Sequence, residues 1–194
     1  MFKSKSLIIL FSLFIFFGFF SCKEAYTPKP PGYFRIEYPE HSYQLFDSSC
    51  HFTFEYPIYA QLEKDKSRNS EPCWFNIFYV PFEARLHLSY KQLDDIEHFY
   101  TLVRDSRDLV YKHSVKADAI GESFIQTDKG VTGKLYELEG STASAVQFFV
   151  TDSISHYLRA SLYFNSRINR DSLDPIIDFL KIDIKHMINS LEWK

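Results

Sequence analysis

The segment ARLHLSY at residues 84–90 shows the clearest alternation of apolar and polar residues in the chain. Because successive side chains of a β-strand point to opposite faces, this period of two predicts a strand with one face in a core. Similar short runs precede it and predict strands at residues 33–38, 43–46, 52–56 and 74–80. The polar stretch 59–71 is predicted to be a surface loop.

Two segments have the 3.6-residue period of an amphipathic helix instead. The first covers about residues 94–112, and Asp94 or Asp95 is placed to cap its free amides. The second begins at Asp171 or Ser172, and Pro175 is expected in its first turn, where a missing amide costs little. Its apolar stripe consists of Leu173, Ile176, Ile177, Leu180, Ile184, Met187, Ile188 and Leu191.

Four more strands are predicted between the helices, at residues 120–127, 131–139, 145–151 and 157–164. The turns that separate them are short enough for antiparallel hairpins. Residues 33–194 are therefore predicted to form a single α+β domain, a mainly antiparallel sheet with two principal helices packed on it. The order of elements also resembles the Mog1/PsbP-type sandwich, including the strand that ends in Tyr56-Pro57.

The start of the chain has the order of a secretory signal. Lys3 and Lys5 precede a mostly apolar run at residues 7–20, which is shorter than the about 20 residues of a membrane-spanning helix. The run ends in Ser21-Cys22, which resembles a bacterial lipobox, where a peptidase cuts after residue 21 and the cysteine carries a diacylglycerol. The alternative is a secretory signal that merely ends near a cysteine.

On the lipobox interpretation, residues 1–21 are a signal peptide and Cys22 is the lipid anchor. Residues 22–32 then form a tether, because three prolines and a glycine in KEAYTPKPPG disfavour a helix. The lipid bilayer is a predicted partner through the acyl chains on Cys22. The expected location is the cell envelope, with the domain facing the periplasm, at either the inner or the outer membrane.

The charge balance argues against nucleic acid as a partner. Without Lys3 and Lys5, the chain has 20 Lys+Arg against 25 Asp+Glu, a net charge of −5. Phosphate backbones require a basic face, so we expect no nucleic-acid binding.

Cys50 and Cys73 remain once Cys22 is assigned to the lipid. In an oxidising compartment they predict a disulfide, and the alternative is two independent buried thiols. The sequence contains no Cys-x-x-Cys, so neither a redox site nor a zinc site is predicted.

The sequence contains none of the common signatures of hydrolases, nucleotide-binding proteins and zinc proteases. We therefore predict no catalytic residues, no metal site and no cofactor. A Ser/His/Asp set can be assembled from Ser114, His113 and Asp118, but sequence neighbours seldom supply all three roles. The exit of the first helix is better interpreted as an exposed recognition surface, with Lys112, His113, Lys116 and Asp118 as its candidate residues.

Several segments together resemble the gliding motility lipoprotein GldD family of the Bacteroidota. They are YTPKPPGYFRIEYPE (26–40), CHFTFEYPIYA (50–60), CWFNIFYVPFEARLHLSYK (73–91), DSRDLVYKHSVKADAI (105–120), VQFFVTDSISHYLRASLYFN (146–165) and DSLDPIIDFLKIDIKHMINSLEWK (171–194). They cover nearly all of the chain after Cys22, in collinear order.

The resemblance implies a membrane-tethered accessory component for gliding and for the type IX secretion system. It assigns the lipid to Cys22 and places Cys50 and Cys73 where the family has paired cysteines. It supplies no catalytic residues and implies other gliding and secretion proteins as partners. Two other hypotheses stay open: a binding module for an envelope glycan or small molecule, and an envelope hydrolase.

Overall fold

The structure, a computed structural model, describes residues 36–165 and 170–194. The predicted signal peptide, Cys22 and the predicted tether lie outside these residues. The predicted strand at 33–38 lies partly outside them, and its described part is not a strand. The alternation of residues 36–38 instead brings Tyr38 against a helix, where its ring stacks on Phe179 with centroids 4.7 Å apart.

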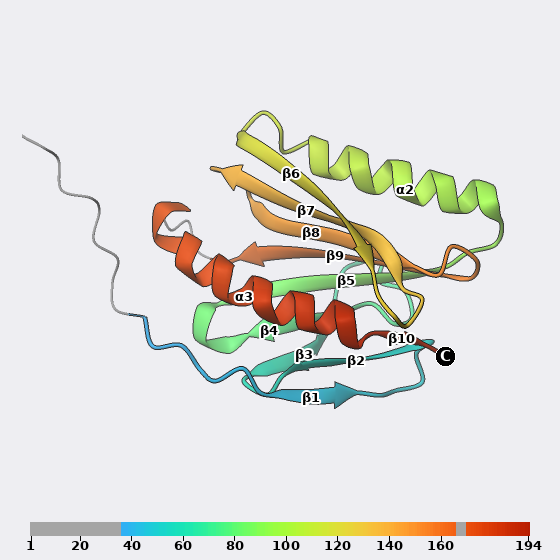
Figure 1. Cartoon of the computed structure of the whole chain (residues 1–194), viewed down its shortest axis with the longest axis horizontal. Helices are drawn as coiled ribbons and strands as arrows, with labels where there is room; N and C mark the ends of the chain where they lie inside the picture. The colour runs from blue at the N-terminus through green and yellow to red at the C-terminus, as the bar shows by residue number, and fades with distance from the viewer. Residues whose placement is uncertain (1–35, 166–169) are drawn as a thin grey trace, which may run out of the picture. The chain divides into compact units, whose positions relative to one another are not determined.

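The larger sheet has seven antiparallel strands in the order β3-β4-β5-β9-β8-β7-β6 (Figure 1). Their bounds are β3 Ala60–Lys64, β4 Phe75–Tyr79, β5 Ala84–Gln92, β6 Ala117–Gln126, β7 Thr132–Gly140, β8 Ser144–Thr151 and β9 His156–Phe164. The predicted hairpins join β6 to β7, β7 to β8 and β8 to β9. A short 3-10 helix, η1 Val80–Phe82, connects β4 to β5.

A second sheet has three antiparallel strands in the order β1-β2-β10, with bounds β1 Tyr43–Phe46, β2 Phe52–Pro57 and β10 Glu192–Trp193. The Sγ atoms of Cys50 and Cys73 are 2.11 Å apart and join the segment before β2 to the segment before β4. This disulfide therefore links the small sheet to the large one.

The helices are α2 Ile96–Tyr111 and α3 Arg170–Ser190. Helix α3 and the small sheet share one core with the inner face of the large sheet. Helix α2 packs on the opposite, outer face, in a core made of Leu93, Val110, Tyr136, Leu138, Phe149 and Tyr157. None of these residues belongs to β3, β4 or β5, and Figure 1 shows α2 along the other half of the sheet. Neither α2 nor α3, the helices of residues 36–165 and 170–194, therefore covers the outer face of β3–β5.

These elements confirm the predicted α+β class, with corrections at three places besides the predicted strand at 33–38. Strand β3 lies inside the predicted loop 59–71, because it is an edge strand with mostly exposed side chains and so lacks an apolar alternation. Strand β10 was not predicted, since two residues carry no periodicity. Helix α3 begins at Arg170, so Pro175 lies beyond its first turn; the apolar stripe could not indicate the polar residues that precede it.

Candidate functional site

One polar residue from each of five neighbouring strands lies in a single row across the outer face of the large sheet. The row follows from the strand register, because each residue is paired with the next across the ladder. It consists of Glu63, Asn76, His87, Ser161 and Gln147. The end at Gln147 meets the region covered by α2, and the rest crosses the uncovered half.

Arg159 lies beside this row on β9, two residues before Ser161 and on the same face. Its Nη2 donates a hydrogen bond to Gln147 Oε1 at 2.6 Å, and Ser161 Oγ donates to the same oxygen at 3.4 Å. Gln147 and Ser161 are buried, with 1% and 2% of their surface exposed. They therefore hold the guanidinium in one orientation.

No carboxylate lies within 4.0 Å of the Arg159 guanidinium in the described part of the chain. Burial lowers the pKa of Arg159, although the group remains positively charged at neutral pH. Buried cations normally have an anionic partner. Arg159 is thus a largely desolvated positive charge that lacks one.

The sequence-predicted surface at the exit of α2 is divided between two places. His113 lies close enough to Arg159 that its pKa is lowered, first by burial and then by the arginine charge. Lys112 and Lys116 are exposed. Asp118 instead faces a depression of about 480 Å³ whose other walls include the α3 residues Asp174, Asp178 and Lys181.

A second cavity, of about 580 Å³, lies at the β3 edge of the outer face. It is lined by Glu63, Lys64, Lys66, Asn76 and Arg85. Arg85 Nε donates to Glu63 Oε2 at 2.9 Å, and its guanidinium stacks over Phe78 with 4.0 Å to the ring centroid. The hydrogen bond raises the pKa of Arg85 and lowers that of Glu63. This cation is therefore already neutralised.

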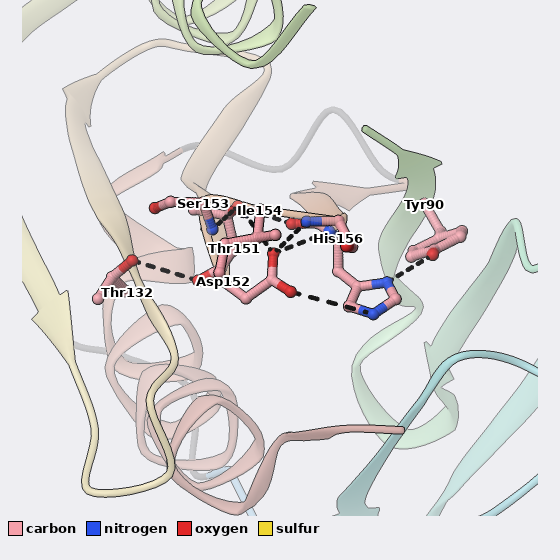
Figure 2. Close-up of polar contacts among 8 residues, drawn as sticks. Tyr90, Thr132, Thr151, Asp152, Ser153, Ile154 and His156 are labelled. Atoms are coloured by element: carbon pink, nitrogen blue, oxygen red, sulfur yellow. Dashed lines mark hydrogen bonds and ion pairs between the residues drawn. The ribbon is translucent and has the colours of Figure 1, made fainter. Parts of the chain in front are cut away.

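The turn between β8 and β9 contains the arrangement that most resembles catalytic machinery. Figure 2 shows the ring of His156 between Tyr90 and Asp152. Tyr90 Oη and His156 Nδ1 are 2.8 Å apart, whereas Asp152 Oδ2 is 4.0 Å from His156 Nε2. Asp152 Oδ1 accepts hydrogen bonds from three backbone amides of the turn, at 2.9 Å each: those of Ile154, Ser155 and His156.

This hydrogen-bonding geometry is typical of a structural turn rather than of an active site with a nucleophile. Burial raises the pKa of Tyr90, which makes its hydroxyl a weaker nucleophile. Within residues 36–165 and 170–194, no hydrogen bond joins a serine, threonine or cysteine side chain to a histidine ring. Ser114, His113 and Asp118 likewise make no hydrogen bond with one another.

Sequence reasoning did not single out Arg159, Gln147 or Ser161. One signal was present: Gln147 is the only polar residue in the run 145–150, and a polar residue in a buried strand requires a partner. The identity of that partner depends on which strands are neighbours, and periodicity carries no information about that.

Neither α2 nor α3, the helices of the described chain, is long and apolar enough to cross a bilayer. No curated protein matches the sequence. The solution structure of cyanobacterial PsbP (CyanoP) from Synechocystis sp. PCC 6803 is similar over 80% of this chain and 95% of its own, at 10% identity. The TM-score of the two structures is 0.47.

The sequence profile described as "Gliding motility lipoprotein GldD" matches residues 23–193. The match covers both sheets, both helices and the outer face with Arg159. It begins directly after Cys22, where the sequence predicts the lipid. The chain therefore belongs to the gliding motility lipoprotein GldD family.

Proposed function

We propose that this protein is a non-catalytic accessory component of the gliding motility and type IX secretion machinery, held at an envelope membrane by a lipid on Cys22. The observation that carries the proposal is the family match over residues 23–193, which starts immediately after the cysteine of the lipobox-like segment. The domain boundaries fit this function: residues 1–21 are removed, residues 22–32 tether, and residues 33–194 fold.

The outer face of the large sheet is the surface proposed to contact partner proteins. It combines an uncovered set of strands with a fixed arginine and partly buried aromatic rings such as Phe78 and Tyr163. Arginine and aromatic residues are enriched where proteins bind one another. Anchoring to the membrane raises the local concentration near membrane-bound partners, so that weak contacts suffice.

Replacement of the anchor tests the proposal. Cys22→Ala should give a folded protein that no longer sediments with membranes and no longer supports secretion. Ser21→Ala is the matched control, because it keeps a small residue before the cysteine and should retain both properties. Mass spectrometry of the mature amino terminus should show the acyl mass in the control. Full secretion by an unlipidated, soluble Cys22→Ala protein would contradict the proposal.

A second candidate is binding of an envelope glycan, and the cavity beside Arg85 favours it. Calorimetric titration with soluble peptidoglycan fragments distinguishes the two functions. Saturable binding that Arg85→Gln removes would support the glycan function. If millimolar concentrations of the fragments give no heat of binding, the accessory function is the better supported of the two.

A further inference from the structure

We infer that the outer face of the large sheet binds a carboxylate of an acidic, extended segment of a partner protein, with the guanidinium of Arg159 as the anchor. This inference rests on the proposed function, because it specifies the chemistry of the partner that such an accessory protein would contact.

The first step is the uncompensated charge. Arg159 is partly buried, and no carboxylate of the described residues lies within ion-pair distance. Removing an ion from water costs several kcal/mol after relaxation, and a nearby opposite charge offsets much of that cost. A carboxylate of a binding partner would therefore gain more binding free energy at Arg159 than at a fully hydrated surface arginine.

The second step is orientation. Gln147 and Ser161 are almost fully buried in the sheet and fix one edge of the guanidinium through Nη2. In the described chain, the buried side-chain atoms without a hydrogen bond are Asn76 Oδ1, Gln147 Nε2 and Trp193 Nε1. Nε and Nη1 of Arg159 are not among these buried atoms, and they have no hydrogen-bond partner among residues 36–165 and 170–194. Both atoms therefore reach the surface. Their N–H groups can pair with the two oxygens of a carboxylate in the planar geometry that arginine favours.

The third step concerns the class of anion. The two cations on strand β5 of this face already have carboxylate partners, since Arg85 pairs with Glu63 and Lys91 pairs with Glu71. The guanidinium of Arg159 carries one positive charge, which matches one carboxylate better than a phosphate, which carries up to two negative charges. The rings of Phe78 and Tyr163 supply the apolar contact that a peptide chain uses and an inorganic anion does not.

The dimensions of the face also suit a peptide. From β9 to β3 there are three inter-strand spacings, or about 14 Å at the usual separation. An extended segment of about four residues has this length. An acidic stretch crossing the strands would thus cover the whole uncovered half.

Fluorescence anisotropy with the full-length lipidated protein in detergent tests the inference. The probe is fluorescein-labelled pentaglutamate, with labelled pentaglutamine as the neutral comparison. We expect pentaglutamate to bind more tightly than pentaglutamine, and Arg159→Met to weaken its binding at least about tenfold. Lys185→Met is the matched control, because it removes the same charge from an exposed position of α3 and should change binding less than about twofold.

Gln147→Glu provides a second test that does not depend on the fold tolerating loss of the arginine. It keeps the shape of the side chain and places a carboxylate against the guanidinium inside the protein. It also removes the unpaired Nε2 donor. We expect a higher melting temperature together with loss of pentaglutamate binding, since the internal carboxylate occupies Arg159.

Four results would overturn the inference: no preference for pentaglutamate, equal loss of binding in Lys185→Met and Arg159→Met, unchanged pentaglutamate binding in Gln147→Glu, or displacement of the probe by inorganic phosphate at a concentration where glutarate has no effect. Arg159-dependent binding to phosphatidylglycerol vesicles without pentaglutamate binding would likewise assign the site to a lipid headgroup. Because the assay needs no membrane tethering, its outcome is independent of Cys22→Ala, and each proposal can fail separately.

Discussion

Nδ1 of His41 lies 2.7 Å from Oδ1 of Asp183, a carboxylate with no exposed surface in the middle of α3. Tyr43 donates to the same oxygen at 2.9 Å, and Tyr59 donates to Oδ2. Burial, followed by the hydrogen bond to Asp183, raises the pKa values of both tyrosines, so both stay protonated donors at neutral pH. One buried carboxylate on α3 thus holds the segment around His41 and Tyr43 in place.

Loss of this carboxylate should destabilise the fold. Asp183→Ala leaves the partly buried hydroxyls of Tyr43 and Tyr59, and the more exposed ring of His41, without their acceptor. A buried donor left without a partner costs about 1–3 kcal/mol. We expect the free energy of unfolding to fall by at least about 3 kcal/mol, measured by urea denaturation. Limited proteolysis should also cut the variant between residues 36 and 42, before β1.

Asp178→Ala is the matched control on the same helix. Asp178 has 73% of its side chain exposed and forms a surface ion pair with Lys181. Such surface ion pairs contribute about 0–1 kcal/mol. An equal loss of stability in both variants would show that the buried hydrogen bonds are not what holds the segment.

The disulfide should contribute measurably because it closes a long loop. Cys50 and Cys73 are separated by 23 residues, and the chain-entropy estimate for such a loop is about 3 kcal/mol. The double variant Cys50→Ser, Cys73→Ser avoids a free thiol and should unfold at correspondingly lower urea concentration. The wild-type protein in reductant should match it, whereas reductant should not affect the variant further. A reductant-insensitive wild-type protein would contradict the prediction.

Most of the fold could be predicted because periodicity depends on local sequence. The alternation of residues 84–90 and the stripe of α3 identify the elements and their buried sides. The same stripe gave no hint of Asp183, whose partners lie 124 to 142 residues away in the chain. The role of a charged residue on the buried side of a helix can be inferred only when the residues that face it are known.

The candidate site was less predictable for the same reason. The sequence indicated the exit of α2, and His113 does lie near Arg159. In the sequence, Arg159 was only one of the polar residues in the predicted strand 157–164. Its pairing with Gln147 depends on the register of β8 with β9, which contains an irregularity between Ser144 and Gln147. No spacing rule places that irregularity.

Gly133 on β7 should not tolerate a side chain. A Cβ at this position would lie 2.0 Å from the carbonyl oxygen of Phe149 and 3.0 Å from Cα of Val150, both backbone atoms of β8. The strands would have to separate, so we expect Gly133→Ala to cost at least about 2–3 kcal/mol by thermal or urea unfolding. Gly121→Ala on β6 is the control: its nearest contact would be an ordinary 3.7 Å, and it should change stability by less than about 1 kcal/mol.

His156 should make stability depend on pH. Its side chain is 13% exposed, and burial, opposed in part by Asp152, lowers its pKa below the ordinary value of 6.5. The unfolded chain therefore binds a proton at this residue more readily than the folded protein does. The contribution of neutral His156 is present above pH 6.5 and is lost as the pH falls below it. We expect the melting temperature to drop between pH 7.5 and pH 5.5.

His156→Asn tests the assignment, because asparagine can still hydrogen-bond to Tyr90 and does not titrate. The difference in melting temperature between pH 7.5 and pH 5.5 should be smaller in the variant than in the wild-type protein. Between pH 7.5 and pH 9 the two proteins should respond alike, since His156 is neutral throughout that range. A variant whose melting temperature falls as steeply toward pH 5.5 as that of the wild type would place the acid sensitivity at another group.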